Sequence, residues 1–262
     1  MRIKYKNEHY FDEIDTEEKA YWLGFLYADG NISKPIRTVK GEEKPWYRIE
    51  VSLKYEDVEH LEKLRKALQM EAPIRKSHTN FKQCDRARLS FNSKHMWNIL
   101  NEYGCTPCKS KTLTFPDVKI FKSRSLIKHF IRGYVDGDGC LSYCNQEHSR
   151  AHLSILGTKN MLENIQNWIP LQFKLQVCGK SNENVQILSI VGRTAFFIAN
   201  YLYSNSTIRL ERKYNKYLEY CRLYLEEYGL QLGKYGELWN ENTVVNSEIT
   251  KGSESPYSVE TE

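Results

Sequence analysis

A ten-residue pattern occurs twice in this chain, as YWLGFLYADG ending at Gly30 and as FIRGYVDGDG ending at Gly139. When the copies are aligned on Asp29 and Asp138, both carry a glycine five residues before the aspartate and another directly after it. The positions between are mostly aromatic or aliphatic. An internal repeat of this kind indicates two copies of one structural unit and restricts the chain to pseudo-symmetric folds.

The residues that follow each copy repeat in the same order. Arg48–Lys54 alternates polar and apolar residues, which predicts a half-buried strand, and Ala151–Thr158 is its counterpart. An amphipathic pattern of helical period follows each of these strands. A further strand is predicted at Arg86–Phe91 in the first half and at Gln186–Val191 in the second.

Each half then closes with helical sequence, which Ser93 can cap in the first half and which runs over about 194–225 in the second. The predicted fold is α+β, with two αββαββα repeats related by a pseudo-twofold axis and with antiparallel sheets. We expect the first repeat at 1–116, the second at 117–226, and an acidic, disordered tail at 227–262.

The composition is that of a globular protein, with 40% hydrophobic and 27% charged residues. No stretch has the ~18 consecutive apolar residues of a membrane helix, and the N-terminal residues have no apolar run of the signal-peptide type. Seven cysteines, an odd number, argue against a disulfide framework. We therefore expect an intracellular protein with no membrane segment.

The positive charge is concentrated away from the C-terminus. The whole chain has a net charge of +5, but residues 237–262 hold six acids and one base, which leaves +10 on the remainder. A basic body favours a polyanionic partner, first of all a nucleic acid.

Both copies of the repeated pattern are predicted to be helices with a bare stripe. Small residues recur along one face of each, at Ala20, Gly24, Ala28, Gly133 and Gly137. Helices with such stripes can approach backbone to backbone. If the two pack side by side in the same direction, as pseudo-twofold symmetry requires, their C-terminal ends meet and Asp29 lies next to Asp138.

Two carboxylates in that position are electrostatically unfavourable. The C-terminus of a helix carries about half a negative charge, and neighbouring carboxylates repel each other. A divalent cation removes both penalties, and oxygen ligands of this kind suit Mg2+. A single Asp-Gly pair at a helix end is usually only a turn, but its recurrence at Asp29 and Asp138 favours a shared metal site for phosphodiester hydrolysis.

The stretches WLGFLYADG and IRGYVDGDG resemble the paired signature of LAGLIDADG homing endonucleases, in the single-chain form with two motifs. The resemblance extends to about residue 225, and Thr106–Pro116 and Thr207–Tyr217 are similar to phage and bacterial members. It implies a monomer with internal pseudo-twofold symmetry that makes double-strand breaks in a long DNA target. It also implies Mg2+ as the cofactor, and we expect Mn2+ to substitute.

The resemblance assigns the metal ligands. Asp29 and Asp138, the last acids of the two motifs, are implied to bind the ion, with help from the carbonyl groups of Ala28 and Gly137. Asp136 has no acidic counterpart in the first copy, so it is not expected to be a ligand.

The resemblance also implies basic residues near the scissile phosphate. Lys54, after the first strand, is implied to activate or orient water. The second half has Thr158 at that place, with Lys159 adjacent, so we expect catalytically unequal half-sites. A further basic residue is expected from near each closing helix, with Lys213 taken as the catalytic candidate; the candidates are Lys109 or Lys111, and Arg212 or Lys213.

The family fold implies that the sheets form two saddles along the DNA major groove. The polar faces of the predicted strands carry the candidate base-reading residues Arg48, Glu50, Ser52, Arg86, Arg88, Ser90, His152, Ser154, Gln186 and Ser189. Arginine reads guanine and glutamine reads adenine in this groove. Phosphate contacts are expected from Lys76, Lys82, Lys174 and Lys180.

Two alternatives share this scaffold, an RNA-binding intron maturase and a non-cleaving DNA-binding regulator. Loss of the paired aspartates would favour either one. Asp29, Asp138 and Lys54 are all present, so the sequence favours a nuclease.

Overall fold

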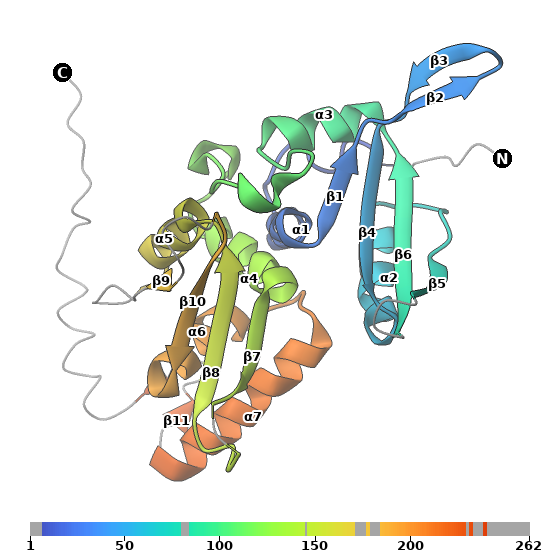
Figure 1. Cartoon of the computed structure of the whole chain (residues 1–262). Coiled ribbons are helices and arrows are strands. Elements are labelled where there is room, and N and C mark those ends of the chain that lie inside the picture. The colour runs from blue at the N-terminus through green and yellow to red at the C-terminus, as the bar shows by residue number, and fades with distance from the viewer. Residues whose placement is uncertain are drawn as a thin grey trace, which may run out of the picture.

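Two four-stranded sheets and a pair of helices between them make up the centre of the molecule (Figure 1). The computed structural model describes residues 7–79, 84–144, 146–170, 177–178, 184–228, 231–232 and 238–239. Among the described helices, none combines the length and the apolar character that crossing a bilayer requires.

The first half begins with a central helix and builds a sheet beside it. Its elements are α1 (Glu17–Ala28), β1 (Gly30–Ser33), β2 (Ile36–Val39), β3 (Glu42–Pro45), β4 (Arg48–Lys54), η1 (Tyr55–Asp57), α2 (Val58–Ala67), β5 (Arg75–Thr79), β6 (Cys84–Asn92), α3 (Lys94–Glu102), η2 (Lys109–Lys111) and η3 (Val118–Ile120). The antiparallel sheet has the strand order β1-β4-β6-β5.

The second half repeats this order. Its elements are α4 (Leu126–Asp138), β7 (Gly139–Tyr143), β8 (Ala151–Gly157), α5 (Lys159–Trp168), β9 (Val177–Cys178), β10 (Gln186–Val191), α6 (Gly192–Tyr203), α7 (Glu211–Tyr228), β11 (Gln231–Leu232) and β12 (Leu238–Trp239). The strand order β7-β8-β10-β9 matches that of the first sheet. The predicted α+β fold, with two αββαββα repeats and antiparallel sheets, is therefore confirmed.

The strand register makes the two halves comparable residue by residue. Gly30 pairs with Val51 where the first sheet begins, and Gly139 pairs with Ile155 at the same point of the second. Val51 then pairs with Leu89 on the next strand, as Ile155 pairs with Leu188. These pairings fix which residue of one sheet corresponds to which residue of the other.

Alternation of residue type decides how each strand is buried. In β4, Ile49, Val51 and Leu53 are buried, while the polar residues between them point to the other face. Helices contact the sheets, α2 on β4 and β6, and α5 and α6 on β8 and β10. The strands predicted at Arg48–Lys54 and Gln186–Val191 have those bounds in the structure.

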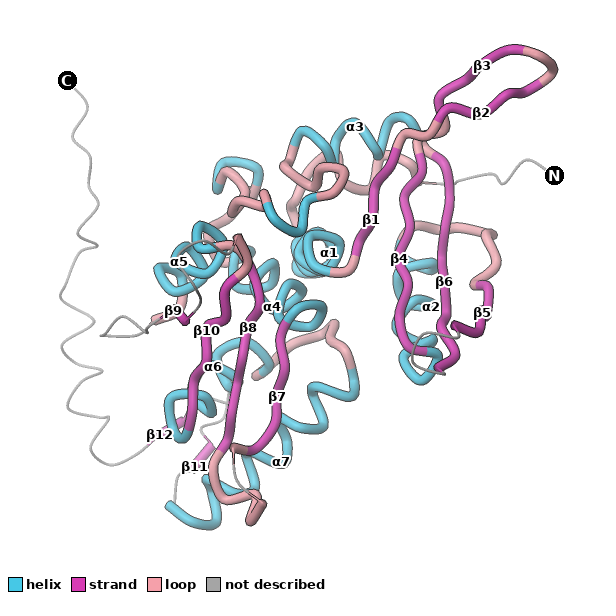
Figure 2. Tube along the Cα trace, viewed as in Figure 1, coloured by secondary structure: helices cyan, strands magenta, loops and turns pink. Residues whose placement is uncertain are grey.

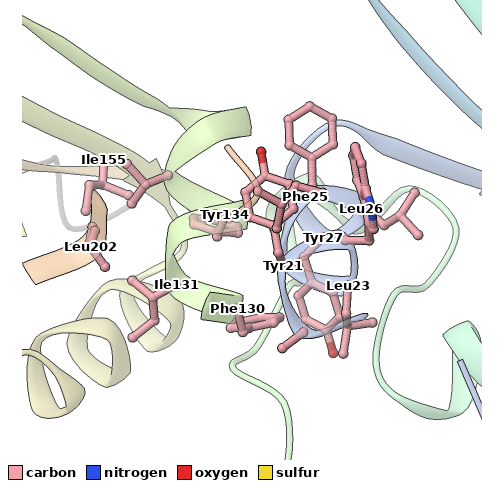
Figure 3. Packing of buried hydrophobic residues seen from close by; sticks show 14 of the residues in the cluster. Tyr21, Leu23, Phe25, Leu26, Tyr27, Phe130, Ile131, Tyr134, Ile155 and Leu202 are labelled. Carbon is pink, nitrogen blue, oxygen red and sulfur yellow. The ribbon is translucent and has the colours of Figure 1, made fainter. Parts of the chain in front are cut away.

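The two central helices touch backbone to backbone because glycines leave room for it. A Cβ added to Gly24 would lie 1.9 Å from the carbonyl oxygen of Phe130, and one added to Gly133 would lie 2.0 Å from that of Tyr21. Figure 3 shows the aromatic side chains around this contact, among them Tyr27 and Phe130. The predicted bare stripes are therefore the contact between α1 and α4.

Two buried charged residues of α4 join segments from both halves. Arg132 is fully buried and donates from Nη2 to Glu17 Oε1 at 2.6 Å and from Nε to the carbonyl of Ile208 at 3.0 Å. Asp136, also buried, accepts hydrogen bonds from the hydroxyls of Tyr21 at 2.7 Å and Tyr203 at 2.6 Å. The carboxyl group of Asp136 is thus hydrogen-bonded inside the protein.

The hairpin of β2 and β3 was not predicted. It is exposed at every residue and projects from the first sheet between β1 and β4 (Figure 2). Its turn uses positive φ angles at Lys40 (55°) and Gly41 (81°), which glycine tolerates readily. Of the tail predicted at 227–262, the structure describes the end of α7 and the backbone of β11 and β12; the remainder lies outside the described residues.

Candidate active site

The C-terminal ends of α1 and α4 meet and carry the matching aspartates of the internal repeat, Asp29 and Asp138. Asp29 caps α1, with its backbone N–H donating to the carbonyl of Phe25 at 2.9 Å, and Asp138 is the last residue of α4. A Cβ added to Gly137 would lie 2.2 Å from the Cβ of Ala28 and 3.4 Å from the backbone nitrogen of Asp29. Both aspartates remain partly exposed.

The carboxyl group of Asp29 perturbs the pKa of Asp138. Burial raises the pKa of Asp138, and the negative charge of Asp29 raises it further, to about 6. Burial also raises the pKa of Asp29, against the opposing positive charges of Lys213 and Lys109. The helix ends therefore hold acids that a positive charge would stabilise in their ionised form.

Lys109 and Lys213 occupy matching places in the two halves, each with its ammonium group at the backbone carbonyls that flank one of the two aspartates. The Nζ of Lys109, from η2, donates to the carbonyl of Gly30 and lies 3.4 Å from that of Ala28. The Nζ of Lys213, from α7, donates to the carbonyls of Asp136 and Gly139, each at 2.6 Å. Both side chains are buried, and each ammonium group opposes the negative end of a helix.

This pairing selects among the basic candidates from the sequence. Lys111 is exposed, and the guanidinium of Arg212 pairs with Asp57 at 3.2 Å. Lys109 and Lys213 are instead the equivalent residues of the two halves. Burial lowers the pKa of Lys213. The ammonium of Lys213 is directed at backbone carbonyls, which makes it a positioning group for the end of α4.

Lys54 and Thr158 are equivalent in the strand register, but their surroundings differ. Lys54 ends β4 and is exposed. Thr158 is buried; its hydroxyl donates to the carbonyl of Leu113 at 2.5 Å and accepts from the N–H of Met161 at 3.2 Å, capping α5. Neighbouring Lys159 is exposed. A buried helix cap therefore stands where the first half has an exposed lysine.

One face of the first sheet is not covered by helices and is called here the first outer face. It carries all six polar residues predicted from the strands of this sheet. They are Arg48, Glu50, Ser52, Arg86, Arg88 and Ser90. The guanidinium of Arg86 donates to the Ser52 hydroxyl at 3.0 Å. That of Arg48 donates to the hydroxyl of Ser33, on β1, at 3.1 Å. Together these groups offer donors and acceptors along one surface.

The corresponding second outer face carries three of the four residues predicted from its strands, His152, Ser154 and Ser189. His152 Nε2 lies 2.9 Å from the Ser189 hydroxyl, in hydrogen-bonding contact. Gln186 was grouped with them wrongly. Gln186 pairs with buried Gly157 and is two residues away from buried Leu188 on the same strand. Its side chain therefore points to the helix-covered side, as that of Leu188 does.

Of the four lysines predicted to contact phosphates, the structure describes Lys76, and its position does not support that role. Lys76 pairs in register with buried Ala87, so it is directed away from the first outer face, and its ammonium lies 2.7 Å from a carboxylate oxygen of Asp85. The other three, Lys82, Lys174 and Lys180, lie outside the described residues.

Sequence reasoning missed the neighbouring outward positions. On the edge strands and strand ends these include Asn31, Ser33, Arg75, Ser77, Asn92, Cys140, Ser142, Leu156, Ile187 and Val191. The alternation of β8 and β10 could have identified Leu156, Ile187 and Val191, which lie on predicted strands. Residues of β1 and β7 required the register, because those short strands directly follow the helices.

No family model matches this sequence, and no curated protein does. Solved structures do match. Meganuclease I-SmaMI bound to uncleaveable DNA has a TM-score of 0.57 at 12% identity, over 81% of this chain and 92% of that chain. The I-LtrWI LAGLIDADG homing endonuclease bound to target DNA has 0.54 at 14% identity, over 95% and 99%. LAGLIDADG meganuclease I-AabMI bound to uncleaved DNA has 0.52 at 13% identity, over 89% and 98%. This chain therefore has the fold of these double-motif proteins.

Proposed function

We propose that this protein, which has the LAGLIDADG meganuclease fold, is a site-specific homing endonuclease. It makes metal-dependent double-strand breaks in a long DNA target by hydrolysing one phosphodiester bond in each strand. The observation that carries the proposal is the meeting of Asp29 and Asp138 at the paired ends of α1 and α4, where burial and mutual repulsion raise the pKa of Asp138.

The donor set at the helix ends fits Mg2+, and Mn2+ is expected to substitute. Asp29 and Asp138 would supply carboxylate oxygens, and Ala28 and Gly137 would supply backbone carbonyls, all oxygen donors of the kind that Mg2+ prefers. When bound, the ion would stabilise the negative charge that develops on the phosphate and on the leaving oxygen. The similar protein I-SmaMI has been crystallised with uncleaved DNA target in the presence of calcium ions.

The remaining residues of the site have distinct roles in this proposal. Lys54 is exposed beyond the start of β1 at Gly30, where its ammonium can orient a water molecule or contact a phosphate. Lys109 and Lys213 hold the carbonyls at the helix ends and offset part of the carboxylate charge. Because Thr158 is committed to capping α5, the second half lacks an equivalent of Lys54.

Double-stranded DNA is the proposed partner. The first and second outer faces would each lie along the major groove of one half-site, and the +10 charge outside residues 237–262 would favour the phosphate backbone. One chain supplies both sheets and both aspartates, so we propose a monomer with 1–116 serving one half-site and 117–226 the other.

The test is cleavage of a randomised duplex library by the purified full chain with Mg2+. The proposal predicts staggered double-strand breaks at one long site. Binding of duplex DNA without cutting in either Mg2+ or Mn2+ would contradict an endonuclease. Preference for structured RNA over every duplex would replace it with an intron maturase.

A further inference from the structure

The two outer faces differ in chemistry at equivalent positions. Three pairs of equivalent residues are polar in both sheets, namely Arg48 and His152, Glu50 and Ser154, and Ser90 and Ser189. Three other pairs change from polar in the first sheet to aliphatic in the second, namely Ser52 and Leu156, Arg88 and Ile187, and Asn92 and Val191. The fold is repeated, but the surface it presents is not.

The three aliphatic side chains are exposed. Leu156 and Ile187 each keep 43% of their surface accessible, and Val191 keeps 44%. Leu156 and Ile187 are direct cross-strand partners, so they form one apolar patch. This patch gives the second outer face an apolar surface at positions where the first outer face has Ser52 and Arg88.

The surroundings of the patch fit DNA. Its polar neighbours, His152 and Ser189, are hydrogen-bonded to each other at 2.9 Å, so the aliphatic side chains lie among polar groups and not in a purely apolar surface. The described outward residues of β7, β8 and β10 include no carboxylate. Arg150 and Arg193 lie at the end of the sheet farthest from Asp138. The surface is therefore complementary to a polyanion with apolar groups.

We propose that the second sheet reads its half-site by apolar contact with thymine methyl groups, whereas the first reads its half-site by hydrogen bonds. The inference rests on the proposed function. Among the base edges of the major groove, thymine alone presents a methyl group, and aliphatic side chains recognise it by contact. The first sheet has Arg88 at the position of Ile187, and arginine prefers guanine.

The position of the patch also orders the contacts along the half-site. Leu156 directly follows Ile155, which pairs with Gly139 at the end of α4. The carbonyl of Leu156 accepts a hydrogen bond from the Tyr134 hydroxyl of α4 at 3.0 Å. Val191 lies at the opposite end of β10. Leu156 and Ile187 therefore face thymines near the cleavage centre, and Val191 faces one farther out.

The test replaces thymine with deoxyuridine, which removes the methyl group and leaves base pairing intact. The target is first selected by library cleavage. Two substituted duplexes are then made, each with every thymine of one half-site replaced. The dissociation constant of each duplex is measured with the unaltered chain. Burial of one methyl group stabilises by ~0.8 kcal/mol, so each lost contact should weaken binding about fourfold. We expect about 60-fold for the three contacts of Leu156, Ile187 and Val191 in the second half-site and little change in the first.

Protein variants then assign the effect to the patch. Ile187→Arg and Leu156→Ser each introduce the residue of the first sheet, and each should lower the discrimination between thymine and deoxyuridine targets about fourfold. Ser189→Ala, on the same face, should keep the discrimination of the unaltered chain. These side chains are exposed, and circular dichroism checks that each variant is folded.

The outcomes separate this inference from the proposed function. A chain that cuts its target but loses no more affinity from deoxyuridine in the second half-site than in the first overturns the inference alone. A selected second half-site without thymine does the same. A chain that neither binds nor cuts any duplex refutes the proposed function itself.

Discussion

Asp138 lies close enough to Asp29 for the negative charge of Asp29 to raise the pKa of Asp138, which burial has already raised, to about 6. The two residues are 109 positions apart in the chain and meet because α1 and α4 pack through glycines. The folded protein thus holds a pair of carboxyl groups that are costly to ionise together unless a cation joins them.

The first prediction concerns Asp138→Asn in metal-free buffer. Because the folded pKa of Asp138 exceeds its ordinary value of 3.8, the folded state binds more protons, and stability falls as the pH rises from about 4 to 6. At pH 7 this penalty is complete. Asp138→Asn should therefore raise the free energy of unfolding at pH 7 by about 1–2 kcal/mol.

Urea denaturation with EDTA at pH 5 and pH 7 measures the effect, which should be larger at pH 7. Asp85→Asn is the control, because a hydrogen bond from Lys76 lowers the pKa of that exposed carboxyl, so its removal should not stabilise. A less stable Asp138→Asn at pH 7 would mean that the carboxylate is not under electrostatic strain.

The second prediction concerns Lys213→Met. The change leaves the carbonyls of Val135, Asp136 and Gly139 without their buried donor, so the free energy of unfolding should fall by about 2–4 kcal/mol. It also removes a positive charge that lowers the pKa of Asp138. The pH midpoint for Mg2+ binding, followed by calorimetry, should then move upward.

Lys111→Met is the matched control, since exposed Lys111 lies on the surface and its loss should change stability by less than about 0.5 kcal/mol. Equal effects of the two lysine variants would contradict a positioning role for Lys213.

The third prediction concerns Gly133→Ala. The added Cβ would lie 2.0 Å from the carbonyl oxygen of Tyr21, so α1 and α4 must separate. We expect a loss of about 3 kcal/mol or more in the free energy of unfolding, measured by urea denaturation. Gly192→Ala meets no atom within 4 Å but has a φ of +66°, so it should cost only about 1–2 kcal/mol. Comparable losses would argue against backbone contact at Gly133.

Alternation and repetition predicted much of this fold. In β4 and β10, the alternation of residue type in the sequence matches the alternation of inward and outward side chains in the sheets. Gly24 and Gly133 predicted the contact between the two helices. Gln186 was misassigned because its polarity was considered without its place in the alternation of β10. The β2–β3 hairpin was missed because its exposed residues follow no buried face.

The site was only partly predictable because its partners come from distant segments. The sequence offered Lys109 and Lys111 equally, and only the fold shows that Lys109 reaches the carbonyl of Gly30. Likewise, nothing local marks Arg132 as buried, since it contacts Ile208 and Glu17 from other elements. Tertiary contacts of this kind leave no periodic signal.

The fourth prediction concerns unequal strand cleavage. Lys54 is exposed, whereas its equivalent Thr158 is buried and caps α5, so the two strands should be cut at different rates. With strand-specific end labels, a nicked intermediate should accumulate, and Lys54→Met should slow one strand more than tenfold while slowing the other less; tenfold corresponds to about 1.4 kcal/mol. Equal slowing of both strands would show that Lys54 serves the whole site.

The most direct test of the shared carboxylate site compares the unaltered chain with Asp29→Asn and Asp138→Asn on the selected duplex target. Binding is measured by gel shift in Ca2+, and cleavage is measured in Mg2+. The account predicts that all three proteins bind the target and that only the unaltered chain cuts it. Cleavage by either variant at the rate of the unaltered chain would contradict the claim that Asp29 and Asp138 form the catalytic metal site.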